Sequence, residues 1–195
     1  MAQHKTKGSH VIQAQLWIDQ RVGAGAFKKR VAGRGADYEG LILPLVWYDL
    51  EILVDVLVQV GLEVGMTVQD MTQQIARLNA LKDLTTIYRT FLRIAAPVRV
   101  MAFTPRLWST YVSFGEAVAI RNKPGHYVGQ CTGVPKKLLD WSCGAWLGFV
   151  PTAIELAGGR NVKGTITETR PSGTTVSSDL QTLQCYSLQC EVLYR

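Results

Sequence analysis

Four cysteines and three histidines are the residues of this chain that could hold a transition metal: Cys131, Cys143, Cys185, Cys190, His4, His10 and His126. The cysteines lack the Cys-x2-Cys spacing of a zinc site, and the histidines do not cluster with them. In a strand over 184–194, Cys185 and Cys190 would point to opposite faces, because their positions differ by an odd number. We therefore predict no metal site, and we expect reduced cysteines that pack as small apolar side chains.

Hydroxyl groups that could act as nucleophiles lack their usual setting. Ser109, Ser113 and Ser142 do not lie in a Gly-x-Ser-x-Gly turn. His126 is the one histidine that the sequence places far enough inside the fold to act as a base. The sequence accordingly predicts no catalytic residues, and a serine–histidine pair is a minor alternative.

Basic residues follow a glycine-rich segment near the N-terminus. Residues 23–29 lack the Gly-Lys-Ser/Thr ending of a phosphate-binding loop and follow no strand, so we predict a plain turn. The formal net charge is +6, but no nucleic-acid-binding motif accompanies it, and we predict no nucleic-acid partner. A solvated basic surface is the simpler interpretation, with an acidic partner or an anionic membrane as alternatives. The sequence leaves open whether an anion is bound by Lys28, Lys29, Arg30 and Arg34.

The segment 141–159 holds two glycines four residues apart among aromatic side chains. A glycine inside a helix costs about 0.5–1 kcal/mol relative to alanine, so it persists most easily where another backbone or a ligand comes close. Aromatic side chains supply the contact area of a pocket or an interface. The candidate residues for a ligand pocket or a subunit interface are Trp108, Tyr111, Phe114, Trp141, Gly144, Trp146, Gly148 and Phe149. Core packing between helix and sheet is the alternative for each aromatic residue.

The composition is that of a well-packed globular protein. The chain has 195 residues, of which 47% are hydrophobic and 18% are charged. We expect a single domain over residues 1–195. The most apolar stretch, 41–60, is interrupted by proline and acidic residues, so we predict no transmembrane segment. The polar N-terminus has no signal-peptide core, and we expect a cytoplasmic protein.

Residues from about 9 to 112 are expected to form a helical half. Ser9 is expected to cap a helix that ends near Gln20. A helix buried on most sides is expected over 45–60, because one polar stripe recurs every four residues among apolar ones. The stripe consists of Glu51, Asp55 and Gln59.

A second part of the helical half is expected after a capping box at Thr67 and Asp70. It is expected to be two helices or one bent helix, because the apolar seam shifts near Asn79. The seam continues through Leu81, Leu84, Tyr88, Phe91 and Ala95. Pro97 suits the first turn of a short helix, whereas Pro105 is expected to disturb the segment that follows.

Residues from about 114 to 195 are expected to form a β-β-α-β-β unit. Segments 117–120 and 126–131 flank turn residues and predict a hairpin. Pro135 is suited to begin the glycine-containing helix. Pro151 is expected to kink or split that helix near Phe149.

The C-terminal end of this unit is again predicted to be β. A strand over 161–169, a turn at 171–173 and a weak continuation over 174–178 precede the last strand. In that strand the alternating residues are Tyr186, Leu188, Cys190, Val192 and Tyr194. The predicted class is α+β, with the helical half packed on a twisted antiparallel sheet.

Short motifs along the chain resemble one superfamily. Lys7-Gly8 leads into the first helix, and Leu43-Pro44-x-x-Trp47-Tyr48 precedes the buried helix. The C-terminal unit joins Gly125-His126-Tyr127, Cys143-Gly144-x-x-x-Gly148, Ala157-Gly158-Gly159 and a strand through Val162. In this order the motifs resemble the haem-nitric-oxide-binding domains, the 4-vinyl-reductase-type ligand-binding domains and the TRAPP tethering subunits. The closest resemblance is to a mainly myxobacterial family of uncharacterised proteins of about this length.

The haem chemistry of that superfamily does not carry over to the residues of this chain. Haem-binding members use a histidine on a helix before the hairpin, and residues 84–111 contain none. They also bind the haem propionates with a Tyr-x-Ser-x-Arg motif, whereas Tyr111-Val112-Ser113 is followed by Phe114-Gly115. The cysteine arrangement of metal-binding members is not matched by Cys185 and Cys190. We predict no cofactor.

Two functions from different classes follow from these observations. The first is a non-enzymatic interaction or adaptor module, homodimeric, in bacterial signalling or cell organisation. Its helical half and its glycine-containing helix would present surfaces to a protein partner. The alternative is a sensor domain that binds a small hydrophobic or aromatic ligand between helices and sheet. An enzyme is the third class, and we expect the protein not to be one.

Overall fold

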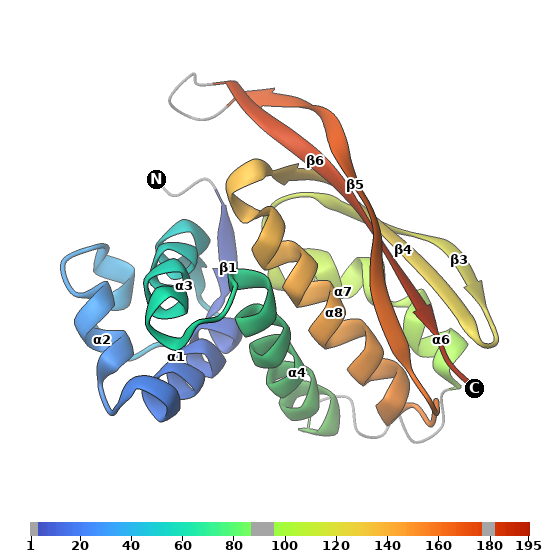
Figure 1. The fold of residues 1–195 in the computed structure, drawn as a ribbon, viewed down its shortest axis with the longest axis horizontal. Coiled ribbons are helices and arrows are strands. Elements are labelled where there is room, and N and C mark those ends of the chain that lie inside the picture. Colours follow the sequence, from blue (N-terminus) through green and yellow to red (C-terminus); the bar gives the residue numbers. More distant parts are fainter. Residues whose placement is uncertain (1–3, 87–95, 177–181) are drawn as a thin grey trace.

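The computed structural model describes residues 4–86, 96–176 and 182–195. Within them, a group of helices lies beside a four-stranded antiparallel sheet (Figure 1). Two long helices, α4 (Val68–Thr86) and α8 (Leu139–Leu156), run side by side between the two parts. The predicted α+β class, with a helical N-terminal half and a β-β-α-β-β unit, is confirmed.

The helical half begins with a short strand. Its elements before α4 are β1 (Lys5–Lys7), α1 (Gly8–Val22), α2 (Ala26–Val31), a 3₁₀ turn (Ala36–Tyr38), β2 (Trp47–Asp49) and α3 (Leu50–Val64). β1 and β2 pair as a two-stranded antiparallel sheet. α3 is buried along most of its length, as its apolar circumference predicts, through Leu50, Leu53, Val56, Leu57 and Val60.

Two helix starts differ from the sequence-based expectation. α1 starts at Gly8, and Ser9 does not cap it; the backbone N–H groups of Gly8 and Ser9 donate to carbonyls of Val46 and Pro44. The buried helix starts at Leu50 rather than at position 45, because Asp49 caps it by accepting from the N–H of Glu51 at 2.8 Å. Tertiary contacts therefore set both helix boundaries.

Residues Val68–Thr86 form one continuous helix, α4. Its capping box is present, since Thr67 Oγ1 accepts from the N–H of Asp70 at 3.1 Å. The helix continues through Asn79, which is fully buried, to Thr86. The expected seam residues Tyr88, Phe91 and Ala95 lie outside the described residues.

Prolines interrupt the structure less than expected. Pro97 and Pro105 each stand in the first turn of a helix, α6 (Pro97–Ala102) and α7 (Thr104–Tyr111). Pro105 therefore begins a helix instead of disturbing one, because the first turn needs no N–H donor. Pro151 lies inside α8, which is not split. Pro171 lies within a continuous strand at a register shift, which an edge strand tolerates.

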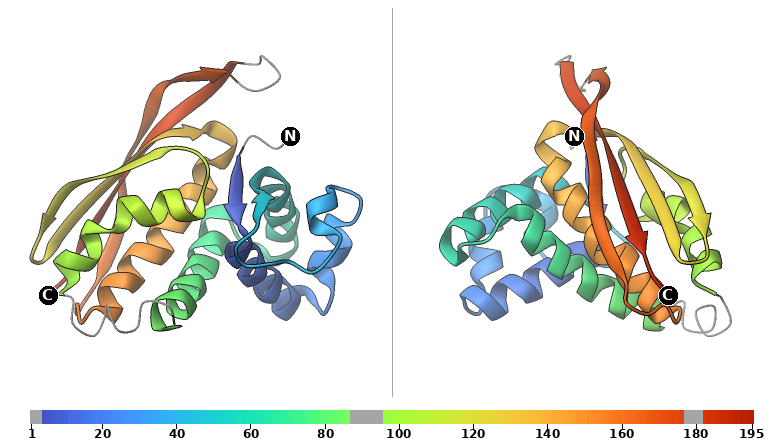
Figure 2. Two further views of the ribbon diagram at one scale, coloured as in Figure 1. Left: turned by 180° about the vertical axis from the view of Figure 1, so that it is seen from behind. Right: turned by 45° about the vertical axis from the view of Figure 1, so that its right-hand side comes forward.

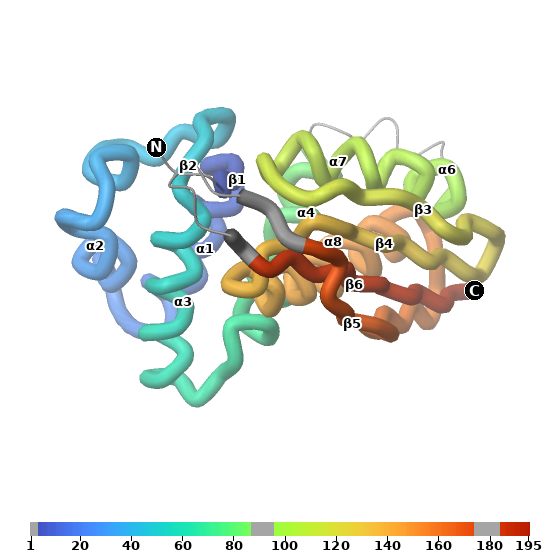
Figure 3. The backbone as a smooth tube through the Cα atoms, turned by 90° about the horizontal axis from the view of Figure 1, so that it is seen from above, coloured from blue at the N-terminus to red at the C-terminus, as the bar shows by residue number. Residues whose placement is uncertain are grey.

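The C-terminal sheet contains four strands in the order β3-β4-β6-β5, all antiparallel. They are β3 (Glu116–Lys123), β4 (His126–Pro135), β5 (Lys163–Val176) and β6 (Thr182–Leu193), with a 3₁₀ turn (Lys136–Leu138) before α8. α8 packs against β5 and β6, and α6 and α7 pack against β3 (Figure 3). The β5–β6 ribbon extends past the helices at one end (Figure 2).

Polar contacts join the helical half to the C-terminal unit. Thr6 of β1 forms a bridge with Val112, at the end of the helical half and just before the C-terminal unit. Glu51 on α3 accepts a hydrogen bond from Lys137 at 3.2 Å and lies 3.1 Å from the imidazole Nδ1 of buried His4. Burial opposes ionisation of Glu51, but these two hydrogen bonds hold the pKa of its carboxyl below the ordinary value. The acidic stripe of α3 therefore contributes to the contact between the helical half and the C-terminal unit.

No helix within residues 4–86, 96–176 and 182–195 combines the length and the apolar character that crossing a membrane requires.

Candidate functional site

The two glycines of α8 are explained by a close helix crossing. A Cβ atom at Gly144 would lie 2.8 Å from the Cβ of Thr72, and one at Gly148 would lie 2.8 Å from the Cβ of Ala76. Both glycines are buried against the backbone of α4. This face of α8 is therefore internal, and the expectation that Gly144 and Gly148 present a surface to a protein partner is wrong.

The candidate aromatic residues form one connected group. The ring of Trp108 lies 6.0 Å from that of Phe114 and 5.8 Å from that of Trp146. Phe114 in turn lies 6.5 Å from Trp141. Phe114, Trp141 and Trp146 are buried, as packing between helix and sheet requires. The structure thus brings together residues that are up to about 40 positions apart in the chain.

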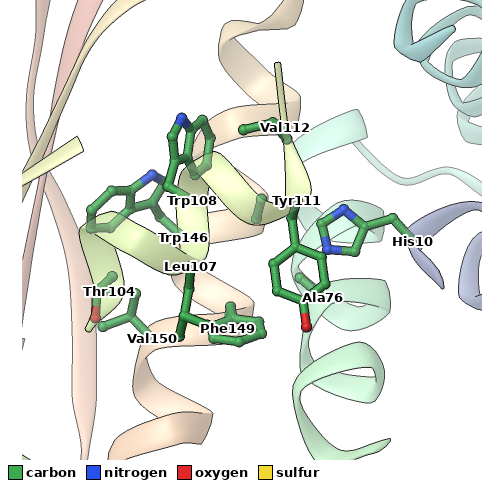
Figure 4. A pocket seen from close by; sticks show the side chains of 11 residues that line it. His10, Ala76, Thr104, Leu107, Trp108, Tyr111, Val112, Trp146, Phe149 and Val150 are labelled. Carbon is green, nitrogen blue, oxygen red and sulfur yellow. The ribbon is translucent and has the colours of Figure 1, made fainter. Parts of the chain in front are cut away.

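A cavity of about 40 Å³ lies beside this group (Figure 4). Its lining comes from α1, α4, α7, the residue after α7, and α8: His10, Ala76, Thr104, Leu107, Trp108, Tyr111, Val112, Ala145, Trp146, Phe149 and Val150. The lining includes four of the eight candidate residues, namely Trp108, Tyr111, Trp146 and Phe149. It is predominantly apolar, with a few polar atoms, as small-molecule sites commonly are.

Sequence reasoning missed His10, which borders this cavity. The imidazole stacks on Tyr111 at 5.0 Å between ring centroids, and its Nδ1 lies 2.9 Å from Thr6 Oγ1. Burial lowers the pKa of His10 to about 4, so the ring is neutral near pH 7. The expectation that His126 is the one internal histidine is therefore wrong. The position of His10 at the start of the first helix gave no signal of the ring contacts made across the fold.

Tyr111 connects the cavity to a buried carboxylate. Its hydroxyl donates to Asp83 on α4 at 2.6 Å. Burial raises the pKa of Asp83 above its ordinary value, although the hydrogen bond from Tyr111 lowers it in part. This contact holds the Tyr111 ring at the cavity wall, between α4 and α7.

Buried side-chain polar groups on α4 and α8 have no hydrogen-bond partner among the described residues; they belong to Thr72, Asn79, Ser142 and Trp146. Trp146 lines the cavity. Asn79 leaves both its amide nitrogen and its oxygen unpaired. Such groups are uncommon in folded proteins, so each needs an explanation.

His126 lies away from the cavity, at the start of β4. Its Nε2 lies 2.7 Å from Glu191 and its Nδ1 lies 3.4 Å from Arg121, both on neighbouring strands. None of the three candidate serines takes part in these contacts. The minor alternative of a serine–histidine pair therefore finds no geometric support.

All four cysteines are buried. Burial raises the pKa of Cys143 to about 11 and that of Cys190 to about 12. These thiols therefore remain protonated at neutral pH and pack as small apolar groups. Among the described residues, no group of three or more potential ligands is placed to hold a metal ion.

Two of the four residues of the basic cluster make contacts within the protein. Lys28 donates to the carbonyls of Tyr38 and Gly40. Arg30 forms an ion pair with Glu63 at 2.5 Å. These contacts hold α2 against its neighbours, so Lys28 and Arg30 have structural roles.

A second depression, of about 350 Å³, lies along α4 and α8. Charged and amide side chains line much of it, among them Asp70, Gln73 and Arg77. It contains none of the candidate aromatic residues. The cavity in Figure 4 is therefore the better match to the predicted ligand site.

Comparison with known proteins shows the fold. No family model matches the sequence, and no curated protein matches it. Several solved structures of H-NOX domains are similar over nearly the whole chain. An Fe(II) unliganded mutant H-NOX protein from K. algicida has a TM-score of 0.69 at 10% identity, covering 97% of this chain and 96% of its own.

Two further structures give the same result. A mutant H-NOX from T. tengcongensis has a TM-score of 0.66 at 12% identity, with 97% of both chains covered. An oxygen-binding H-NOX domain related to soluble guanylate cyclases has a TM-score of 0.63 at 12% identity, covering 97% of this chain and 95% of its own. The resemblance to haem-nitric-oxide-binding domains is thus confirmed at the level of the fold.

Haem, which this fold implies, does not fit the described cavity. Ligand pockets for drug-sized molecules measure about 300–1,000 Å³, and a porphyrin is larger than the roughly 40 Å³ present here. The described lining contains no arginine or lysine that could hold a propionate.

Proposed function

We propose that this protein is a sensor domain that binds a small apolar molecule in the cavity between α1, α4, α7 and α8. The observation that carries the proposal is the apolar lining, in which four aromatic rings meet beside a few polar atoms. The fold supports it, because one similar structure is described as an oxygen-binding domain. The runner-up interpretation of the sequence, a sensor domain for a small hydrophobic ligand, is therefore preferred, but the described lining comes from helices and the residue after α7 rather than from helices and sheet.

The position of the cavity suggests how occupancy would be sensed. Its walls come from both halves of the chain, since His10 and Ala76 belong to the helical half and Trp146 to the β-β-α-β-β unit. α7 contributes Leu107 and is followed by Ser113, whose N–H donates to the carbonyl of Lys5. A ligand that displaces α7 would alter this contact between the halves. We propose that residues 1–195 act in this way as one non-enzymatic domain.

Filling the cavity should abolish the binding of a small apolar probe. Leu107 is half-buried and points towards Phe149 and Val150 (Figure 4). We expect Leu107→Trp to weaken xenon binding by about tenfold or more, because the indole would occupy the space that xenon needs. Methyl NMR of Val112 and Val150 under xenon pressure would measure the affinity.

The matched control is Leu16→Trp, the same substitution at an exposed position of α1. It should leave the xenon-induced shifts unchanged. A wild-type protein whose cavity methyl groups do not respond to xenon would contradict the proposal. Native mass spectrometry of the purified protein, repeated after denaturation, would show whether it carries a ligand from the cell and give that ligand's mass.

The second candidate function is a homodimeric interaction module in bacterial signalling, with a loop of the helical half at the interface. Leu41 and Leu45 are 83% and 82% exposed, and Leu43 and Val46 are exposed beside them. The loop backbone is held in place by the N-terminus of α1 and by Lys7, which donates to the carbonyl of Leu45. Contiguous apolar residues displayed in this way commonly mark an interface.

The dimer is expected to dissociate when the loop is made acidic. Changing both Leu41 and Leu45 to Asp should convert a dimer to a monomer in native mass spectrometry, because paired carboxylates cannot be buried at an apolar interface. Leu62→Asp, at an 85% exposed position near the end of α3, is the control and should leave the dimer intact. A monomeric wild-type protein would remove this candidate. Membership of the mainly myxobacterial family likewise remains a proposal.

A further inference from the structure

His10, which lines the cavity, has one nitrogen whose hydrogen-bonding state follows from its neighbours, Nε2. Thr6 Oγ1 donates to the carbonyl of Tyr111 at 3.2 Å and lies 2.9 Å from Nδ1 of His10. A hydroxyl has one proton, and with that proton on the carbonyl, Nδ1 is the donor in its contact with Thr6. Tyr111 ends α7, where carbonyls lack helical partners, and this arrangement satisfies its carbonyl as well. Neutral His10 therefore carries a free lone pair on Nε2.

Nothing within the described residues uses that lone pair. The hydrogen bonds of the described chain include none to Nε2 of His10. Its ring is stacked on Tyr111, lies 5.8 Å from the ring of Trp141 and is desolvated enough for its pKa to fall. An acceptor in such surroundings is costly unless a donor reaches it. An occupant of the cavity that carries a donor would therefore be favoured over one that does not.

The chemistry of the occupant follows from this acceptor. A hydroxyl group can donate a hydrogen bond to it, whereas a hydrocarbon, an ether or a carbonyl cannot. The indole of Trp146, which Figure 4 shows beside Trp108 and across the cavity from His10, has a buried Nε1. Nε2 of His10 thus matches a hydroxyl.

The volume limits the size of the occupant. A site needs about 10–15 Å³ to hold one water molecule, so a cavity of about 40 Å³ takes a molecule of only a few non-hydrogen atoms. Most of the lining is apolar, which disfavours a molecule with several polar groups. We infer that the cavity selects a short-chain alcohol whose hydroxyl donates to Nε2 of His10. This inference rests on the proposed sensor function and specifies the ligand class of the same site.

Ethanol and dimethyl ether provide a matched test, because they have the same atoms and only ethanol can donate. Each would be titrated into the wild-type protein at pH 7, with the methyl resonances of Val112 and Val150 as the readout. We expect ethanol to bind about five- to tenfold more tightly, the ratio that one hydrogen bond supplies. Equal affinities, or binding of xenon but of neither compound, would overturn the inference and leave the proposed function standing. No response to xenon would instead contradict the proposed function.

Substitution of His10 tests the role of its lone pair. His10→Phe keeps a ring that can stack on Tyr111 but removes the acceptor, so the preference for ethanol should fall to about one. His126→Phe, at a histidine on the sheet, is the control and should retain the preference. A preference that survives in His10→Phe would overturn the inference.

The pH dependence in the wild-type protein tests the same point without any substitution. The groups that face His10 are Thr6 on β1, Tyr111 on α7 and Trp141 on α8, with Asp83 on α4 behind Tyr111. Burial keeps the pKa of His10 near 4, so the lone pair is present at both pH 8 and pH 6. The preference for ethanol should therefore be equal at these two pH values. A loss with a midpoint near 6.5, the ordinary histidine value, would overturn the inference.

Discussion

Replacing Gly144 or Gly148 by alanine should lower the free energy of unfolding by about 2–3 kcal/mol, as overpacking of a core does. At an exposed helical position the same change raises stability by about 0.5–1 kcal/mol, because alanine is the better helix former. Here the new methyl group would meet the backbone of α4, with the N of Gln73 3.0 Å from a Cβ at Gly144 and the N of Arg77 2.9 Å from one at Gly148. The backbone of α4 cannot move away at either position without a shift of the whole helix.

Chemical denaturation of each variant would measure this change. Gly40→Ala is the control, because a Cβ at Gly40 meets no atom within 4 Å and its backbone φ is not positive. Its free energy of unfolding should change by less than about 0.5 kcal/mol. A Gly144→Ala protein that is more stable than the wild type would show that α4 and α8 do not cross as closely as described.

Replacing Asn79 by alanine should raise the free energy of unfolding by about 1–2 kcal/mol. The Asn79 side chain is fully buried in α4, and neither its amide nitrogen nor its oxygen has a partner in the described structure. A buried polar group without a partner loses its hydration free energy and regains nothing. Alanine removes that cost and also has the higher helix propensity.

The control is Gln130→Ala, at an amide whose nitrogen donates to Oγ of Ser187 at 3.0 Å. That substitution should lower the free energy of unfolding by about 1 kcal/mol, because it removes a hydrogen bond that is made. Thermal unfolding of both variants would measure the difference. If Asn79→Ala instead lowers the free energy of unfolding by more than about 1 kcal/mol, the amide of Asn79 is paired in the wild-type protein in solution.

Elements whose signals are local were predicted correctly. The capping box at Thr67 and Asp70, the start of a short helix at Pro97 and the hairpin between β3 and β4 each depend on residues a few positions apart. The predictions that were wrong involve partners distant in the chain. The loop at 44–46 caps α1 in place of Ser9, and the pairing of β2 with β1 delays the start of α3.

Part of the candidate site could also be seen in the sequence. Aromatic residues near two helical glycines indicated a cavity or an interface, and Trp108, Tyr111, Trp146 and Phe149 do line the cavity. His10 could not be found, because its environment is made by Thr6, Tyr111 and Trp141 from other elements. A pKa near 4 depends on burial, which no spacing of residues along the chain reveals.

The amino-acid sequence by itself determined the α+β class, most element types and the set of aromatic residues, because hydrophobic periodicity, capping and turn residues act over a few positions. Only the tertiary structure decided how those elements meet. It placed Gly144 and Gly148 against α4 rather than at a surface, and it put His10 beside Tyr111. The physical reason is that close packing and desolvation depend on distances between segments far apart in the chain, whereas local pattern determines only which face of each segment is apolar.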